Sequence, residues 1–240
     1  MPLEIMTEPG SSLDVLLEPH PARLGVARGA GDMVGGTDDS VAWLCVEGGR
    51  GRLRVAERTV DVDGRADVFE GPGWSALIPP GTGFAVEGTI RYSLAWRPSL
   101  REDLKAEIID PATVVEVDRG SGPCARRVRT YVGRGPLIAG ETLNPPGSWS
   151  SYPPHRHEQE ELYLYRFDPP AGFGVAVNYG LDGETDERAM VVHDGQAQRI
   201  VSGYHPVAAA PGYAMYYLWA LAGESDELEP SFDPLHAERA

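Results

Sequence analysis

The even scatter of turn-forming residues is the feature that most constrains the fold of this chain. Its 240 residues include 29 glycines and 21 prolines, which recur along the whole length rather than collecting in one tail. Glycine and proline interrupt helices and favour turns, so the apolar runs between them are short. We therefore expect an all-β protein of many short strands, without helices longer than two turns.

Apolar runs bounded by turn residues predict the individual strands. In the first half they are Leu13–Leu17, Val41–Val46, Arg52–Val55, Val60–Val62, Ser75–Ile78, Phe84–Val86 and Thr89–Trp96. In the second half they are Thr113–Val117, Arg127–Val132, Leu162–Phe167, Gly174–Tyr179, Ala189–His193 and Met215–Leu221. A short charged segment at 101–105 divides the two sets. The sequence thus predicts two domains, 1–105 and 106–240, each a β-sandwich or jelly roll.

Charge and composition exclude several classes of function. The formal net charge is −15, which argues against binding to nucleic acid or to an anionic membrane surface. An anionic substrate would be repelled at long range, so its site needs local positive charge from a metal or an arginine. The N-terminus lacks an export signal and no apolar run is long enough to span a membrane, so we expect a cytoplasmic protein.

Two further features of composition give expectations about local structure. The only cysteines are Cys45 and Cys124, which give no case for a disulfide framework. Cys45 lies in an apolar run and is expected to be a buried small hydrophobic residue. The acidic run Glu224–Glu229 is expected to be a solvated tail.

Three of the six histidines form a pattern that suits a metal ion. His155 and His157 are two residues apart, so in a strand they point to the same face, and a turn after them can return Glu161 beside them. His205 would complete the set from a distant strand. Three imidazoles and a carboxylate suit a divalent transition metal with positions left open, and zinc, manganese, iron, nickel and cobalt are all compatible. The alternative is that the histidines are ordinary surface residues.

Longer strings around these residues resemble a known family. The strings Gly-Ser-Trp-Ser-Ser-Tyr-Pro-Pro-His-Arg-His at 147–157, Glu-Glu-Leu-Tyr-Leu-Tyr-Arg-Phe at 160–167 and Gly-Tyr-His-Pro-Val at 203–207 resemble the bacterial 5-deoxy-glucuronate isomerases of inositol catabolism, within the cupin superfamily. The short loop before Glu161, Val201 in place of a proline, and the C-terminal end depart from that family's pattern.

The resemblance implies a bicupin fold with two jelly-roll β-barrel domains. It also implies metal-dependent isomerisation of 5-deoxy-glucuronate to 5-dehydro-2-deoxy-gluconate in myo-inositol catabolism. The metal ligands carried over by position are His155, His157, Glu161 and His205. The first domain contains only His20, so no comparable metal site is expected there.

An aldose–ketose isomerase must move a proton between adjacent carbons and stabilise an enediolate, so it needs a general acid or base. Our candidates for catalysis are His193, which precedes a turn, and Tyr163, which shares the strand face of Glu161, whereas Arg166 should point away. Further hydroxyl candidates are Tyr165, Tyr204 and Tyr217. The candidates for binding a substrate carboxylate are Arg126, Arg127, Arg129 and Arg156.

Other readings of the same pattern remain open. The ligand set also suits a related uronate ketol-isomerase or an oxygen-using iron cupin dioxygenase, because one fold serves many chemistries. A different class would be a non-catalytic sugar-binding cupin. In each case the expected partner is a small-molecule sugar acid, with no nucleic acid and no membrane. Homo-oligomerisation is left open by the sequence.

Overall fold

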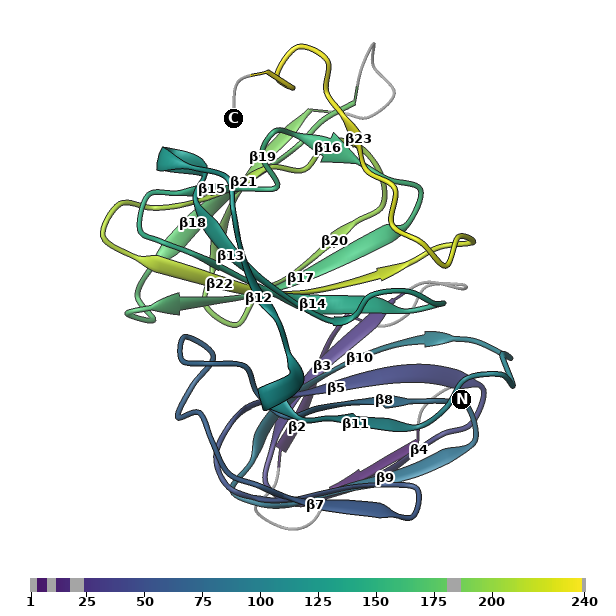
Figure 1. Ribbon diagram of the computed structural model, residues 1–240. Coiled ribbons are helices and arrows are strands. Elements are labelled where there is room, and N and C mark those ends of the chain that lie inside the picture. The colour runs from purple at the N-terminus through teal and green to yellow at the C-terminus, as the bar shows by residue number, and fades with distance from the viewer. Residues whose placement is uncertain (1–3, 8–11, 18–23, 181–186, 239–240) are drawn as a thin grey trace. The chain divides into compact units, whose positions relative to one another are not determined.

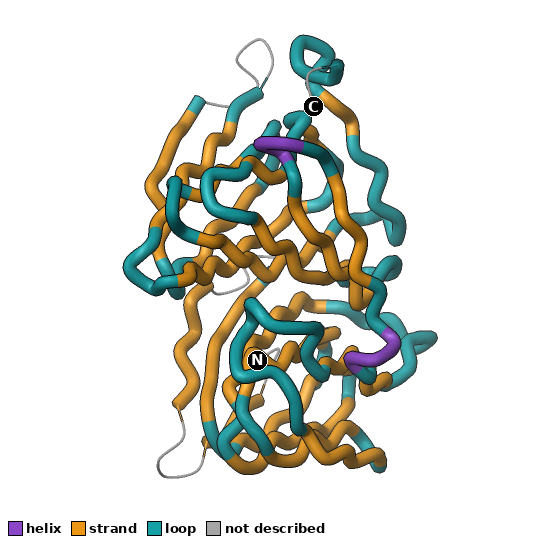
Figure 2. Tube along the Cα trace, turned by 60° about the vertical axis from the view of Figure 1, so that its left-hand side comes forward, coloured by secondary structure: helices purple, strands orange, loops and turns teal. Residues whose placement is uncertain are grey.

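The computed structural model describes residues 4–7, 12–17, 24–180 and 187–238. Strands dominate this part of the chain, and its only helices are two single 3-10 turns, η1 (Pro111–Thr113) and η2 (Gly122–Cys124) (Figure 2). The all-β prediction is confirmed. No helix in the described ranges is long and apolar enough to cross a membrane. His20 lies outside the described residues.

The chain divides into two compact units, Met1–Val114 and Val115–Ala240. The sequence places the boundary earlier, at residues 105 and 106. The difference arises because β11 (Glu107–Ile109) pairs antiparallel with β8 (Ser75–Ile78). The residues that follow the charged segment therefore add an edge strand to the first unit.

The first unit consists of two antiparallel sheets around one core (Figure 1). One sheet has the order β1-β4-β9-β6-β7, with β1 Glu4–Thr7, β4 Met33–Thr37, β9 Thr82–Gly88, β6 Gly51–Val55 and β7 Arg58–Val62. The other has the order β11-β8-β5-β10-β3-β2, with β5 Ser40–Gly48, β10 Arg91–Pro98, β3 Gly25–Ala30 and β2 Ser12–Leu17. Leu53 and Phe84 from the first sheet pack in one cluster with Leu44 and Leu94 from the second. Cys45 is fully buried, as predicted.

The second unit repeats the two-sheet plan and adds a small strand pair. Its larger sheet has the order β12-β13-β14-β22-β17-β20, with β12 Glu116–Arg119, β13 Arg126–Val132, β14 Ile138–Asn144, β22 Ala214–Ala222, β17 Glu160–Asp168 and β20 Ala197–Ile200. The smaller sheet has the order β15-β21-β18-β19, with β15 Trp149–Ser150, β21 Val207–Ala209, β18 Phe173–Asn178 and β19 Arg188–His193. The pair is β16 (His155–Arg156) with β23 (Ser231–Phe232). The core fills the space between the larger and the smaller sheet, where Tyr165 and Phe167 meet Ala176 and Val207.

Strand β14 lies in the middle of the larger sheet although the sequence did not predict it. Its sequence does not form an apolar run, because Gly140 interrupts it and the polar residues Glu141 and Thr142 follow. Glu141 is fully buried, and it is stabilised there by hydrogen bonds from Arg129 (3.1 Å) and from the hydroxyls of Tyr131 and Tyr216. A buried carboxylate needs such partners. Distant residues supply them, so the pattern of the strand alone did not show its burial.

The acidic segment near the C-terminus is attached to the second unit rather than free in solvent. The side chains of Glu224, Glu227 and Glu229 are exposed, as predicted. However, the Gln159 amide donates to the backbone oxygens of Ser225 (3.3 Å) and Glu227 (2.8 Å). The chain then continues into β23, which lies beside β16 (Figure 1). The prediction of a solvated tail is therefore correct for the side chains and wrong for the backbone.

Candidate metal centre

The structure brings three histidines of the predicted metal set together in the second unit. His155 belongs to β16, His157 follows the end of that strand, and His205 lies in the loop before β21. One ring nitrogen from each lies within 4.8 Å of the others, and within the described ranges this is the only histidine, cysteine or acidic cluster of that kind. His205 does not come from a regular strand; it follows Tyr204, which forms an isolated bridge with Tyr179.

Backbone carbonyls orient all three imidazoles in the same way. The Nδ1 contacts are His155 to Pro153 O at 3.4 Å, His157 to Gln159 O at 2.9 Å and His205 to Gly203 O at 2.9 Å. A carbonyl can only accept, so in each ring Nδ1 carries a proton, and Nε2 has a lone pair whenever the ring is neutral. This is the arrangement in which histidine binds a metal through Nε2.

Glu161, at the start of β17, completes the cluster. Its Oε2 atom lies 3.2 Å from His157 Nε2 and 3.1 Å from His205 Nε2. His205 is almost fully buried, and its Nε2 makes no hydrogen bond of acceptable geometry with any described residue. A lone pair that faces a carboxylate oxygen at 3.1 Å is repelled unless a cation lies between them. The four donor groups therefore fit a bound metal ion.

Burial and mutual contact determine the protonation states of these groups. Burial and the neighbouring His205 lower the pKa of His155 to about 4. Burial opposes ionisation of Glu161, but its close contacts with the His157 and His205 imidazoles outweigh burial and hold the pKa of this carboxyl at about 2. Burial also opposes protonation of His157, but the hydrogen bond to Glu161 and its charge raise the pKa of this imidazole. At neutral pH the cluster thus contains an ionised carboxylate and a neutral His155, both in their metal-binding forms.

A cavity of about 140 Å³ opens onto the cluster. Its walls come from β13, β14, β17 and β22, from the segment around β16 and from the C-terminal segment. The lining residues are Arg126, Val128, Thr142, Ser151, His155, His157, Glu161, Tyr163, Tyr217, Trp219, Leu221 and Leu228. Gly140 makes room for one wall, because a Cβ atom there would lie 2.3 Å from the ring of Trp219.

Two tyrosines, Tyr163 and Tyr217, line this cavity. The Tyr163 hydroxyl shares a hydrogen bond of 2.8 Å with Ser151 Oγ, and the Tyr217 hydroxyl shares one with Ser150. Burial raises the pKa of Tyr163 well above its usual value, and the charge of Glu161 adds to this effect. Burial also raises the pKa of Tyr217, although hydrogen bonds to Ser150 and Thr142 act in the opposite direction. Both hydroxyls are therefore protonated at neutral pH and can donate hydrogen bonds to a ligand.

The two residues predicted for catalysis have different positions in the structure. Tyr163 lines the cavity, on the same strand face as Glu161. Arg166 points away and pairs with Asp194 at 3.0 Å, as the alternation of the strand predicted. His193 is exposed at the end of β19, opposite Phe173, and is not among the residues that line the cavity. We therefore do not retain His193 as a catalytic candidate.

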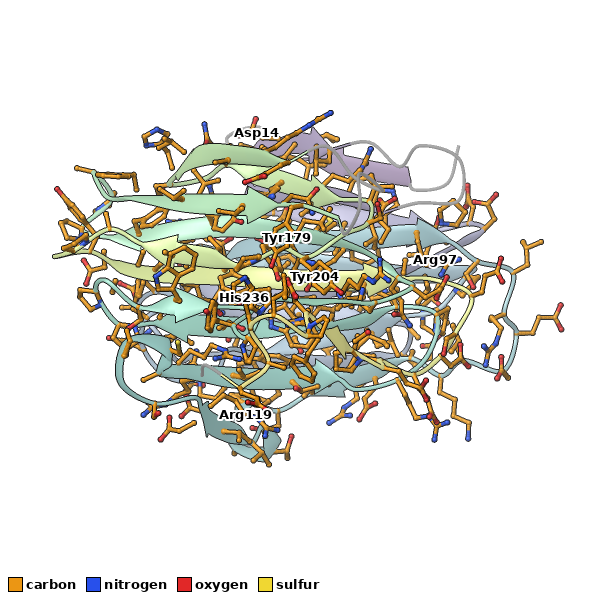
Figure 3. All side chains as sticks on the ribbon, turned by 90° about the horizontal axis from the view of Figure 1, so that it is seen from above. Asp14, Arg97, Arg119, Tyr179, Tyr204 and His236 are labelled. Carbon is orange, nitrogen blue, oxygen red and sulfur yellow. The ribbon has the colours of Figure 1, made fainter. Side chains whose placement is uncertain are left out.

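The C-terminal segment is a part of the site that the sequence did not predict. The ring of Phe232 lies 5.9 Å from that of His155. Asp233 is fully buried and accepts a hydrogen bond of 2.8 Å from the Tyr179 hydroxyl. Tyr179 in turn lies beside Tyr204, with ring centroids 5.2 Å apart (Figure 3). The only local signal was the Asp-Pro turn after an aromatic residue, which does not indicate where a segment packs.

Comparison with known proteins places this geometry in context. The chain is 34% identical over 217 residues to the 5-deoxy-glucuronate isomerase of Geobacillus kaustophilus, covering 83% of this chain and 78% of that protein. The protein of the same name from Halalkalibacterium halodurans is 29% identical over 212 residues, which cover 80% of this chain and 78% of that protein.

Solved structures show that the fold is shared more widely. An IolB-like protein from Salmonella typhimurium superposes with a TM-score of 0.84 at 24% identity, covering 94% of this chain and 97% of that chain. Oxalate decarboxylase from Lactobacillus farciminis superposes with a TM-score of 0.65 at 9% identity, covering 95% and 86% of the two chains. These similarities confirm the bicupin fold that the sequence resemblance implied.

The model of the KduI/IolB family matches residues 24–239, nearly the whole chain. The match includes both units and all four residues of the candidate metal centre. Together with the relatives of the same name, it confirms the resemblance found in the sequence. This chain belongs to the KduI/IolB family.

Proposed function

We propose that this chain is a metal-dependent aldose–ketose isomerase that converts 5-deoxy-glucuronate to 5-dehydro-2-deoxy-gluconate in myo-inositol catabolism. The observation that carries the proposal is the cluster of three imidazoles and Glu161 beside one cavity, in a chain whose relatives bear the name of this isomerase. Strands of the larger sheet form walls of this cavity, and Tyr163 and Tyr217 line it. The arrangement suits a small substrate that must be held by several oxygens.

The metal would be held by His155, His157, Glu161 and His205. The mixed set of nitrogen and oxygen donors is compatible with zinc, manganese, iron, nickel or cobalt. A divalent ion at this position would polarise neighbouring substrate oxygens and stabilise negative charge on them. At neutral pH the protein holds His155 and Glu161 in their unprotonated forms, because the pKa values of both groups are low.

Tyr163 acts in this proposal as a hydrogen-bond donor and not as a base. Because its pKa lies well above the usual value, its hydroxyl stays protonated across the working range of pH. Ser151 holds the hydroxyl through the hydrogen bond of 2.8 Å, which limits its rotation. A fixed donor of this kind stabilises an oxyanion as it develops on the substrate, because no reorganisation is needed during the reaction.

Apolar side chains exclude water from the reacting atoms. Val128, Trp219, Leu221 and Leu228 form the walls on several sides of the cavity. The ring of Phe232 packs against that of His155. Exclusion of water strengthens each polar contact with the substrate and protects an enediolate from unwanted protonation.

The remaining features of the chain support the same assignment. The net charge of −15 supports a protein that does not bind nucleic acid, and its partner would be a small sugar acid. A substrate that is an intermediate of catabolism supports a cytoplasmic location. The second unit would bind the metal, while the first would contribute structure.

An anaerobic turnover assay with 5-deoxy-glucuronate tests the proposal. Protein as purified, protein stripped by a chelator and protein restored with single metals should be compared. We expect the ketose to form without oxygen, to disappear on stripping and to return with at least one metal. Oxygen uptake would instead support the iron dioxygenase alternative. Metal binding without turnover of this or a related uronate would contradict the isomerase and favour a binding protein.

A further inference from the structure

Cross-strand pairing distinguishes the three arginines of β13 from one another. Arg127 lies opposite Asp118 and pairs with it at 3.2 Å. Arg129 is buried and pairs with Glu116 at 2.7 Å and with Glu141 at 3.1 Å. Two of the four arginines predicted to bind a carboxylate are therefore already neutralised by acidic residues of the protein.

Arg126 has a different neighbour. Its partner across β12 is Arg119, a second cation, and β12 offers no acidic residue on that face. Like charges that lie opposite each other in a sheet are destabilising unless an anion is close to them. Within the described residues no carboxylate pairs with Arg126, whose one hydrogen bond runs from Nη1 to the backbone oxygen of Cys124 at 3.0 Å. Because a guanidinium has five N–H donors, most of its donors are still available to a ligand.

The position of Arg126 connects it to the candidate metal centre. It is half-buried and lines the same cavity as His155, His157 and Glu161. Burial raises the pKa of Tyr217, another residue that lines the cavity, and the positive charge of Arg126 acts in the opposite direction. A positive group thus faces a cavity of a protein whose net charge is −15.

The turn before β13 holds this side chain in place. Gly120 has a φ of +68°, and a Cβ atom there would lie 2.2 Å from the backbone oxygen of Cys124. Only glycine therefore allows the tight turn that brings the Cys124 oxygen within hydrogen-bond distance of the Arg126 guanidinium. The hydrogen bond to Cys124 then limits the rotation of Arg126, which reduces the entropy lost when the side chain binds an anion.

The size of the cavity indicates which end of a sugar acid would meet Arg126. A volume of about 140 Å³ is close to that of a cavity that holds benzene. It cannot enclose a six-carbon chain, whose ends lie about 6 Å apart when extended. The reacting end must reach His205 and Glu161, which are buried, so the opposite end lies toward the rim. Arg126 is partly exposed, and it is the one arginine or lysine among the described residues that line the cavity.

We propose that Arg126 binds the carboxylate of the substrate at the rim of the cavity while the opposite end of the substrate lies at the candidate metal centre. This inference rests on the proposed function and adds the residue that selects a sugar acid over a neutral sugar. Arg156, the fourth predicted arginine, lies 5.4 Å from the ring of Tyr204 and lines a neighbouring hollow together with Glu158 and Glu229. Acidic neighbours make that hollow a poorer site for a carboxylate.

The test compares Arg126→Gln and Arg126→Lys with Arg127→Gln. The control removes the same charge from the next residue of β13, on the opposite strand face. Calorimetric titration of metal-loaded protein with glucuronate and with its uncharged amide measures recognition of the carboxylate without turnover. Steady-state kinetics with 5-deoxy-glucuronate give KM and kcat separately. Thermal unfolding of each variant shows whether it is folded.

We expect the wild type to bind glucuronate about 10- to 100-fold more tightly than the amide, the range expected for hydrogen bonds to a charged group. Arg126→Gln should lose this preference and raise KM by a similar factor with a smaller change in kcat. Arg126→Lys should keep part of the preference, and Arg127→Gln should match the wild type.

Other outcomes separate the two proposals. An active isomerase in which Arg126→Gln keeps the preference and the KM would overturn the carboxylate site and leave the proposed function intact. Loss of the preference in a protein that does not isomerise 5-deoxy-glucuronate would support the carboxylate site and contradict the proposed reaction. A folded wild type that binds neither probe would overturn the carboxylate site as well.

Discussion

Replacement of Glu161 by glutamine tests the metal centre most directly. The amide keeps the shape of the side chain and removes its charge. In the wild type Glu161 contributes the only formal negative charge among the four proposed ligands, and its Oε2 atom lies within 3.2 Å of two imidazole nitrogens. We expect the variant to fold and to bind metal much more weakly.

The size of the effect follows from the ionisation of the carboxyl. Its surroundings hold the pKa of Glu161 at about 2, against 4.5 for a free side chain. A difference of roughly 2.5 pH units corresponds to about 3 kcal/mol in favour of the negative form, despite burial. The neighbouring imidazoles produce this preference, and a dication at the site would attract the carboxylate more strongly than they do because it carries twice the charge of a protonated imidazole. The expected loss is therefore about 100-fold or more in affinity.

Competition with a chromophoric chelator measures this affinity, with Zn²⁺ and Mn²⁺ as probes at constant pH and salt concentration. The matched control is Glu160→Gln, because Glu160 is the preceding residue and its side chain pairs with Arg199 at 3.3 Å. This control should lower the free energy of unfolding through the weakened ion pair and leave the metal affinity unchanged. An affinity of Glu161→Gln within about threefold of the wild type would refute the assignment of Glu161 as a ligand.

Three further predictions follow from contacts in and around the site. Tyr163→Phe removes the hydroxyl held by Ser151 and should lower kcat by about 100-fold with little change in KM; steady-state kinetics that show an unchanged kcat would contradict the role of this donor. The pKa of His155 is about 4 in the folded protein and 6.5 in a free side chain, so below pH 6.5 the unfolded state takes up the proton first. Metal-free protein should thus lose stability as the pH falls from about 6.5 to about 4, and urea titrations should show a weaker loss in His155→Gln. Asp233→Ala removes the acceptor of the Tyr179 hydroxyl, so it should cost about 2 kcal/mol of local stability. Limited proteolysis should then cleave the C-terminal segment of the variant sooner than that of the wild type. Equal cleavage rates would show that this contact does not hold the segment.

Much of the fold and of the metal centre could be predicted from the sequence because it depends on local rules. The alternation of side chains in a strand placed Tyr163 with Glu161 and turned Arg166 away. Two histidines two residues apart and a polar turn were sufficient to bring His155, His157 and Glu161 together, since the chain between them is short. Apolar runs between turns likewise gave most of the strands.

The sequence alone determined the all-β class and the identity of the candidate ligands, because both depend on residues that are close together in the chain or on strings that resemble a family. The tertiary structure decided which distant residues meet at the cavity. It directed Arg126 to the cavity, buried Arg129 with Glu141 and left His193 exposed at the end of β19. These outcomes depend on strand register and on which strands are neighbours, both of which arise from contacts between segments far apart in the chain. A strand pattern shows on which face a side chain lies, but only the assembled sheets show what lies opposite that face.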